Sequence, residues 1–146
     1  MEVYPVIECL TPDERAGAFA IRRAVFVVEM QIDPAVERDG RDADAAHFLA
    51  LADGRAVGAG RYVRDGDTIK LGRIAVLPDY RRQGVGRALV RFMLDHARRA
   101  GATRAFLHAQ ASARAFYFAI GFVEEGTPFI EAGIPHISMS LDLSNS

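Results

Sequence analysis

Lysine, cysteine and tryptophan are almost absent from this chain of 146 residues: there is one lysine, Lys70, one cysteine, Cys9, and no tryptophan. One cysteine cannot form an internal disulfide, and it argues against a structural zinc site. No apolar run approaches the length of a membrane span. The first residues lack the basic and apolar regions of a secretory signal. Half of the residues are hydrophobic and a quarter are charged, which predicts a cytoplasmic protein folded as one domain over residues 1–146.

Charge is spread unevenly along the chain, although the net charge is only −1. Seven arginines and one acid lie between Arg81 and Arg104, whereas seven acids and two arginines lie between Glu29 and Asp53. The basic stretch suits a polyanion and the acidic stretch suits a cation, unless the clustering is a chance property of the surface.

Apolar periodicity predicts seven strands and three helices. A capping box at Thr11 starts the first helix, and Ser112 is the expected N-cap of the last. Gly58 and Gly60 weaken one strand and predict a close approach of backbone or ligand there. The segment 29–43 is expected to be a loop with one helical turn. The strands from 46 to 77 are expected to form an antiparallel meander. Strands are expected at 3–9, 46–52, 56–63, 69–77, 103–109, 122–124 and 134–143, the last two joined by a loop with Gly and Pro, and helices at 12–27, 85–100 and 112–120.

A tight turn joins an apolar strand ending at Pro78 to a helix, and two closely spaced glycines, Gly84 and Gly86, lie in it. Such a turn aims several backbone N–H groups at one point before a helix N-terminus, where the macrodipole favours an anion. We interpret it as a pyrophosphate site; the alternative is a glycine-rich turn without a ligand. It is not a dinucleotide fingerprint, because Leu89 stands where a third glycine is needed and several strands precede the turn. A P-loop is excluded because no Gly-Lys-Ser/Thr occurs.

Two motifs together resemble the GCN5-related N-acetyltransferases. Arg81-x-x-Gly84-x-Gly86 is similar to the acetyl-CoA-binding motif of that family, and Ala113-x-x-x-Tyr117-x-x-x-Gly121-Phe122 is similar to the second half of its signature. Residues 22–29 and 133–137 resemble the small bacterial ElaA/YjcF-like branch. The resemblance covers nearly the whole chain.

The resemblance implies an α/β (α+β) fold: a mixed, mostly antiparallel sheet of about seven strands with helices on both faces. The fourth and fifth strands would splay apart around the pantetheine arm of acetyl-CoA, the cosubstrate, and no metal would be needed. The backbone of Ile74, Ala75 and Val76 would pair with that arm. The pyrophosphate would be bound by the amides of Arg82, Gln83, Gly84, Val85, Gly86 and Arg87, with added charge from Arg81, Arg82 and Arg87.

Acyl transfer from a thioester to an amine needs a neutral amine, a polarised carbonyl and a proton for the leaving thiolate. The backbone N–H of Ala75 or Val76 is the candidate for polarising the carbonyl. Tyr117 resembles the proton donor, because a phenol with an ordinary pKa near 10 stays protonated at neutral pH. The alternative for Tyr117 is a tyrosine packed in the core.

Glu29 and His136 are the candidates for the general base. Glu29 could equally be a solvated loop carboxylate, and a lone histidine is more often a structural hydrogen-bonding residue. His47 and His108 are weaker candidates for the base, and His96 is expected on the surface. Cys9 has no evident activator, so a covalent acyl-cysteine route is not expected.

These observations predict an acetyl-CoA-dependent N-acetyltransferase acting on a primary amine by direct attack in a ternary complex. The amine would belong to a small molecule, a peptide or a protein. One alternative is a non-catalytic acyl-CoA-binding module on the same fold. Another is a nucleic-acid-binding domain using the helix from Arg87 to Arg99, but that helix lacks interleaved aromatic residues and the chain is not basic. Neither a nucleic acid nor a membrane is expected as a partner, and the protein would be a monomer or a homodimer.

Overall fold

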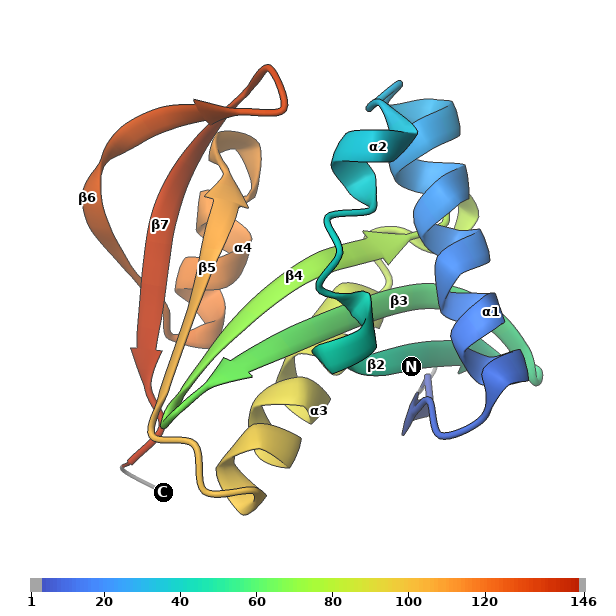
Figure 1. Ribbon diagram of the computed structural model, residues 1–146, viewed down its shortest axis with the longest axis horizontal. Coiled ribbons are helices and arrows are strands. Elements are labelled where there is room, and N and C mark those ends of the chain that lie inside the picture. The colour runs from blue at the N-terminus through green and yellow to red at the C-terminus, as the bar shows by residue number, and fades with distance from the viewer. Residues whose placement is uncertain (1–3, 145–146) are drawn as a thin grey trace.

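The computed structural model describes residues 4–144, and these form a seven-stranded sheet with helices on both faces (Figure 1). The strand order is β1-β2-β3-β4-β5-β7-β6, and β4 with β5 is the parallel pair of this sheet. This confirms the predicted fold, including the antiparallel meander β2-β3-β4. None of the described helices is long and apolar enough to cross a membrane. The elements are β1 (Val6–Glu8), α1 (Pro12–Arg22), a π-helical segment η1 (Arg23–Glu29), α2 (Pro34–Glu37), β2 (Ala46–Ala52), β3 (Arg55–Asp65), β4 (Thr68–Val76), α3 (Val85–Arg99), β5 (Arg104–Gln110), α4 (Arg114–Ile120), β6 (Val123–Glu131) and β7 (Ile134–Asp142).

β4 and β5 pair over only part of their length and then separate, as their ribbons show in Figure 1. The pairing ends at Leu71 opposite Leu107. Just beyond it β4 contains a bulge, since the register with β3 gains one residue on β4 between Gly72 and Ala75. Arg73, in the bulge, has a φ of 54°. A bulge bends its strand, so the second half of β4 is free of β5.

The two faces of the sheet are covered by different helices. Ile21 and Phe26 pack with Ala59 and Ala75 on one face. Side chains of α3 pack on the other face, and there they approach β3 closely: a Cβ on Gly60 would lie 2.8 Å from the Met93 sulfur. The close approach at this strand is therefore made by side chains of α3, whereas a backbone or a ligand was predicted.

The first helix differs from the prediction, because its α-helical part ends at Arg22 and not at Val27. The π-helical segment η1 follows, and after it the N–H of Met30 donates to the carbonyl of Val25, 3.0 Å away. Apolar spacing over two turns cannot distinguish i→i−4 from i→i−5 bonding. The predicted single turn in the next loop is α2, whose N-cap Asp33 accepts the Ala35 N–H at 2.8 Å.

The predicted strand at 46–52 is confirmed as β2, but other predicted boundaries need correction. The expected strand at 3–9 is the shorter β1, and Val3 lies outside the described residues. α4 starts at Arg114 after a 3₁₀ turn, so Ser112 is not its N-cap; that position is Ala113, which makes no side-chain cap. β6 extends to Glu131, and the expected Gly/Pro loop is a bulged stretch of this strand. Proline is tolerated at a bulge on an edge strand.

Candidate active site

The turn before α3 presents a row of unpaired backbone amides. Gly84, with φ of 89°, is the N-cap of α3 and has no side chain to cap it. Among residues 4–144, the amides from 82 to 87 donate to no carbonyl or side chain, and the helical ladder begins with the Ala88 N–H to the Gly84 carbonyl at 3.0 Å. Unpaired amides at a helix start form a binding site for an anion.

The two halves of the signature meet beside this turn. A Cβ on Gly86 would lie 3.4 Å from the Phe116 ring of α4 and 3.8 Å from a methyl group of Val76 at the end of β4. The segment before β1 also contacts the turn: the Tyr4 hydroxyl donates to the side-chain carbonyl of Gln83 at 2.6 Å. A Cβ at Gly86 would therefore make ordinary van der Waals contacts with both Phe116 and Val76.

Arg81 and Glu29 bind each other. Two N–H groups of the Arg81 guanidinium donate to the Glu29 carboxylate at 2.6 and 2.7 Å, and Nε donates to the Val76 carbonyl at 2.9 Å. The hydrogen bond from Arg81 holds the pKa of Glu29 below its usual value. Because the two side chains are paired, Glu29 is poorly suited to act as a base and the charge of Arg81 is not free for a ligand. The pairing connects η1 to the end of β4.

Tyr117 lies on α4 between two aromatic rings. Its ring makes edge contacts with Phe116 and Phe122, with centroids 4.9 and 5.8 Å away. Burial raises the pKa of the Tyr117 phenol to about 12. Within the described part of the chain its hydroxyl has no hydrogen-bond partner, so its proton is not donated to a competing acceptor. Tyr117 is not among the residues that line the cavity described next.

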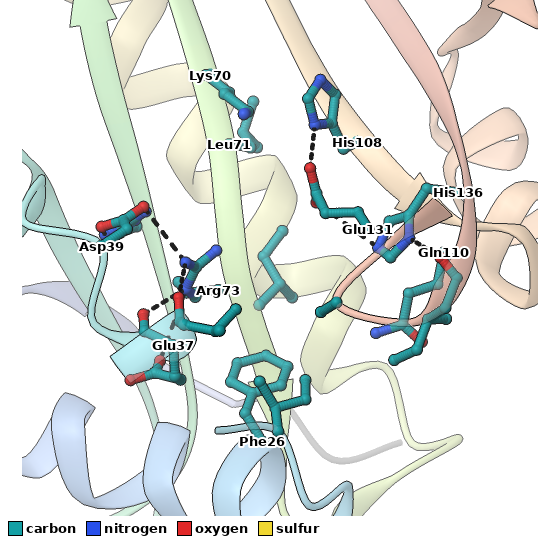
Figure 2. A pocket seen from close by; sticks show the side chains of 16 residues that line it. Phe26, Glu37, Asp39, Lys70, Leu71, Arg73, His108, Gln110, Glu131 and His136 are labelled. Atoms are coloured by element: carbon teal, nitrogen blue, oxygen red, sulfur yellow. Dashed lines mark hydrogen bonds and ion pairs between the residues drawn. The ribbon is translucent and has the colours of Figure 1, made fainter. Parts of the chain in front are cut away.

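A cavity of about 370 Å³ lies where β4 and β5 diverge, on the side of η1 and α2 (Figure 2). One wall comes from β4 and from the segment that follows η1, and the other from β5 and the β6–β7 hairpin. The lining residues are Phe26, Ile32, Val36, Glu37, Asp39, Arg61, Lys70, Leu71, Arg73, Ile74, His108, Gln110, Glu131, Ala132, Ile134 and His136.

His136, a predicted base candidate, lies in this cavity together with the weaker candidate His108. Nδ1 of His136 is 2.7 Å from the Ile134 carbonyl oxygen. A carbonyl only accepts, so Nδ1 carries the proton and the neutral ring has its lone pair on Nε2. Nε2 has no hydrogen bond among the described residues, and it lies 3.8 Å from Oε2 of Glu131. The ring stacks on Phe129 at an interplanar angle of 25°.

Glu131 was missed by sequence reasoning, and it links the two histidines of the cavity. Nδ1 of His108 lies 2.9 Å from Oε1 of Glu131. His108 and His136 are 28 positions apart, and they share one face because β5 and β7 are paired, with Gln110 opposite His136. Alternation along a strand could have indicated that His108 and Gln110 share a face, but not that Glu131 lies beside them.

The other two histidines lie elsewhere. His47 is buried, with Nε2 at 2.8 Å from the Asp42 carbonyl, and it packs against Phe19. His96 is not a simple surface residue as predicted: it is half-buried, and its ring nitrogens contact the Tyr62 hydroxyl at 2.7 Å and Glu8 at 3.0 Å. Residues 4–144 contain no group of three His, Cys, Asp or Glu side chains that could hold a metal ion.

Arginines neutralise much of the acidic stretch that suggested a cationic partner. Arg22, only 1% exposed, binds Glu37 at 2.6 Å and Asp42 at 2.7 Å. Arg61 binds Asp42 at 2.8 Å, and its hydrogen bonds hold the pKa of Asp39 well below its usual range. Glu37 and Asp39 line the cavity in these pairs, and none of the three carboxylates is free to bind a cation.

Comparison with known proteins points to one family. The model of the acetyltransferase (GNAT) domain matches residues 11–143. The uncharacterized N-acetyltransferase YjcF of Bacillus subtilis is 35% identical over 131 residues, which cover 89% of this chain and 94% of YjcF. A solved structure from Lactobacillus plantarum has a TM-score of 0.90 at 29% identity, covering 97% of this chain and 99% of that one. Escherichia coli ElaA has a TM-score of 0.83 at 27% identity, with coverage of 94% and 99%.

Proposed function

Since this chain belongs to the GCN5-related N-acetyltransferase (GNAT) family, we propose that it transfers an acetyl group from acetyl-CoA to a primary amine by direct attack in a ternary complex. The observation that carries this proposal is the row of unpaired amides from 82 to 87 next to the split between β4 and β5. Amides at a helix start suit a pyrophosphate. The second half of β4, from Ile74 to Val76, has no partner on β5 and suits an extended amide-containing arm.

Each part of the cosubstrate has candidate residues. Gln83, Gly84, Val85 and Gly86 contribute backbone amides, and the exposed Arg82 and Arg87 add charge as well as amides. Acetyl-CoA supplies the thioester when it is bound. The N–H of Val76 would polarise the thioester carbonyl, because it points away from β3. The Ala75 N–H is not suited to this role, because the antiparallel register that pairs Leu77 with Val57 also makes Ala75 and Ala59 a hydrogen-bonded pair. The bulge at Arg73 supports the role of Val76, because it turns this end of β4 away from β5.

Tyr117 is the proposed general acid, and His136 is the proposed general base. The raised pKa of Tyr117 keeps the phenol protonated until a thiolate forms beside it. His136 is favoured over Glu29 because its Nε2 is free in the cavity, whereas the Glu29 carboxylate is bound by Arg81.

The test is Tyr117→Phe, measured by acetyl-CoA binding in a calorimetric titration and by release of the CoA thiol with a panel of primary amines. We expect binding within a factor of about two of wild type, and turnover lower by roughly 10²-fold, the usual size of a general-acid contribution. Tyr62→Phe is the control, because it removes a phenol from the α3 side of the sheet.

Three outcomes distinguish the readings. Turnover of Tyr117→Phe equal to wild type removes the general-acid assignment. A wild-type protein that binds acetyl-CoA but releases no thiol with any amine is the non-catalytic acyl-CoA-binding module. If the wild type does not bind acetyl-CoA, the proposed function fails altogether.

A further inference from the structure

We infer that Glu131 and His136 together form the binding site for the ammonium group of the acceptor, and that His108 is a positioning residue that holds Glu131. This inference rests on the proposed function and deepens it. Figure 2 shows the three side chains converging from β5 and from the β6–β7 hairpin on the same end of the cavity.

The gap between Glu131 and His136 fits a third polar atom. Oε2 of Glu131 and Nε2 of His136 are 3.8 Å apart, which is too far for a good hydrogen bond between them. Both atoms are acceptors, because a carboxylate has no proton and the proton of the His136 ring is on Nδ1. Two acceptors facing one gap call for a ligand with at least two N–H donors, and a primary ammonium has three.

The carboxylate of Glu131 is held although the residue lies at the end of an edge strand. Its other oxygen, Oε1, is 2.9 Å from Nδ1 of His108. Phe129 contacts both imidazole rings, with centroids 4.9 Å from His108 and 5.9 Å from His136. The side chain of Glu131 is 46% exposed, so without His108 it would be free to turn into solvent.

The other two carboxylates that line the cavity are paired with arginines, so Glu131 is the carboxylate that can bind a cationic ligand. Asp39 is bound by Arg61 and Arg73, and Glu37 is bound by Arg22. Glu131 has no arginine partner among the described residues. The cavity also contains Lys70, which has no ion pair in that part of the chain and lies on β4. An ammonium group would therefore bind at the hairpin end, away from the arginines.

The same site would supply the neutral amine. One N–H bond of the bound ammonium breaks and an Nε2–H bond forms on His136, while the electron pair of the broken bond stays on the amine nitrogen for attack. The imidazolium that results lies beside the negative charge of Glu131, which stabilises it, and it returns its proton to solvent. No oxidant, metal or further reactant is needed for this step.

The experiment uses 2-phenylethylamine as the probe, with side-chain NMR of the histidines for binding and thiol release for turnover. Acetyl-CoA is kept at saturation when the amine is varied, and the amine is kept at saturation when acetyl-CoA is varied. Glu131→Gln keeps the shape and removes the charge. We expect it to raise the KM for the amine about tenfold to hundredfold, the range for losing a hydrogen bond to a charged group, and to leave the KM for acetyl-CoA unchanged. His136→Asn keeps a donor near Nδ1 for the Ile134 carbonyl but lacks Nε2. It should lower kcat by roughly 10²-fold and abolish the acid limb of the pH profile.

A matched pair at position 108 separates positioning from packing. His108→Asn places an amide N–H near the place of Nδ1 and should retain most of the amine affinity. His108→Leu cannot donate to Glu131 and should raise the KM for the amine as Glu131→Gln does. The pH profile is compared across all variants because Glu37, Asp39, Lys70 and Arg73 also face the cavity.

Several results overturn the inference while the proposed function stands. One is acetyl-CoA binding and amine turnover with Glu131→Gln and His136→Asn both within about twofold of wild type. Another is a wild-type protein that binds acetyl-CoA but shows no shift of the His136 resonances with 2-phenylethylamine up to its solubility limit. Failure of the wild type to bind acetyl-CoA, in contrast, is failure of the proposed function itself.

Discussion

Replacement of Arg61 by methionine tests the charge cluster that forms one wall of the cavity. Arg61 is only 5% exposed and binds two carboxylates: Nη1 lies 2.9 Å from Asp39 and 2.8 Å from Asp42. Methionine keeps an unbranched apolar stem without the charge. In Arg61→Met, Asp42 retains Arg22 at 2.7 Å, whereas Asp39 retains Arg73 at 3.3 Å and the Arg41 backbone N–H at 3.1 Å.

The expected loss of unfolding free energy is about 3 kcal/mol, the lower end of the range for removing one partner of a buried ion pair. The lower end applies because the side chain of Asp39 is 33% exposed and Asp42 keeps a partner. For a chain of this size, such a loss lowers Tm by roughly 6 to 12 °C. The assay is urea and thermal unfolding followed by circular dichroism.

The effect has a defined pH dependence. The hydrogen bond from Arg61 lowers the pKa of Asp39 in the folded state. A carboxyl group with a lowered folded-state pKa stabilises the fold above its unfolded-state pKa, near 3.9, and this stabilisation is lost as the pH falls further. The difference between wild type and Arg61→Met should therefore be full from pH 7 to about 5, and should narrow below about pH 4.

Arg99→Met is the control for Arg61→Met. It removes an exposed pair on α3, in which Arg99 is 81% exposed and lies 3.1 Å from Asp95, and its effect should be within about 0.5 kcal/mol of zero. The reasoning is refuted if Arg61→Met loses no more stability than Arg99→Met, or if its deficit is the same at pH 3 as at pH 7.

Two further predictions concern packing and thiol chemistry. Gly60→Ala places a Cβ 2.8 Å from the Met93 sulfur and should cost about 1 to 3 kcal/mol by overpacking. Gly72→Ala in the neighbouring strand meets nothing within 4 Å and should cost less in the same urea titration; equal losses would contradict the packing argument. Burial raises the pKa of the Cys9 thiol to about 11, and because the thiolate is the reactive form, iodoacetamide at pH 8 should label Cys9 in denaturant and not in the native protein. Labelling is measured by mass spectrometry. Rapid labelling of the native protein would contradict the prediction, because it would show that the thiol is accessible.

Much of the fold could be predicted because its signals are local. The meander follows from alternating apolar residues, and the long helix after the turn follows from its i, i+3, i+4 pattern and from Gly101, whose φ of 92° ends it. The errors lie where two local conformations share one pattern. A π-helical turn and an α-helical turn both bury Val25 and Phe26, and Ser112 is a good N-cap residue at a place where a 3₁₀ turn precedes the helix.

The candidate site was predictable in part for the same reason. Tyr117 and His136 were named from motifs, and their proposed roles still await experiment. His108 was only a weak candidate and Glu131 was not considered, because no spacing along the chain relates positions 108, 131 and 136. Pairing of Glu29 with Arg81, 52 positions away, had no local signal either.

The sequence by itself determined the family, the order of the elements and the turn that starts α3, because each depends on residues close together in the chain. Gly84 and Gly86 specify that turn through their own conformational freedom and small size. Only the tertiary structure decided which charges are free. Packing α1 and α2 against the sheet binds Arg22 and Arg61 to the acidic segment, while the pairing of β5, β7 and β6 brings His108, His136 and Glu131 together at the cavity. The energy of a charge depends on its burial and its neighbours, and both are properties of the folded chain.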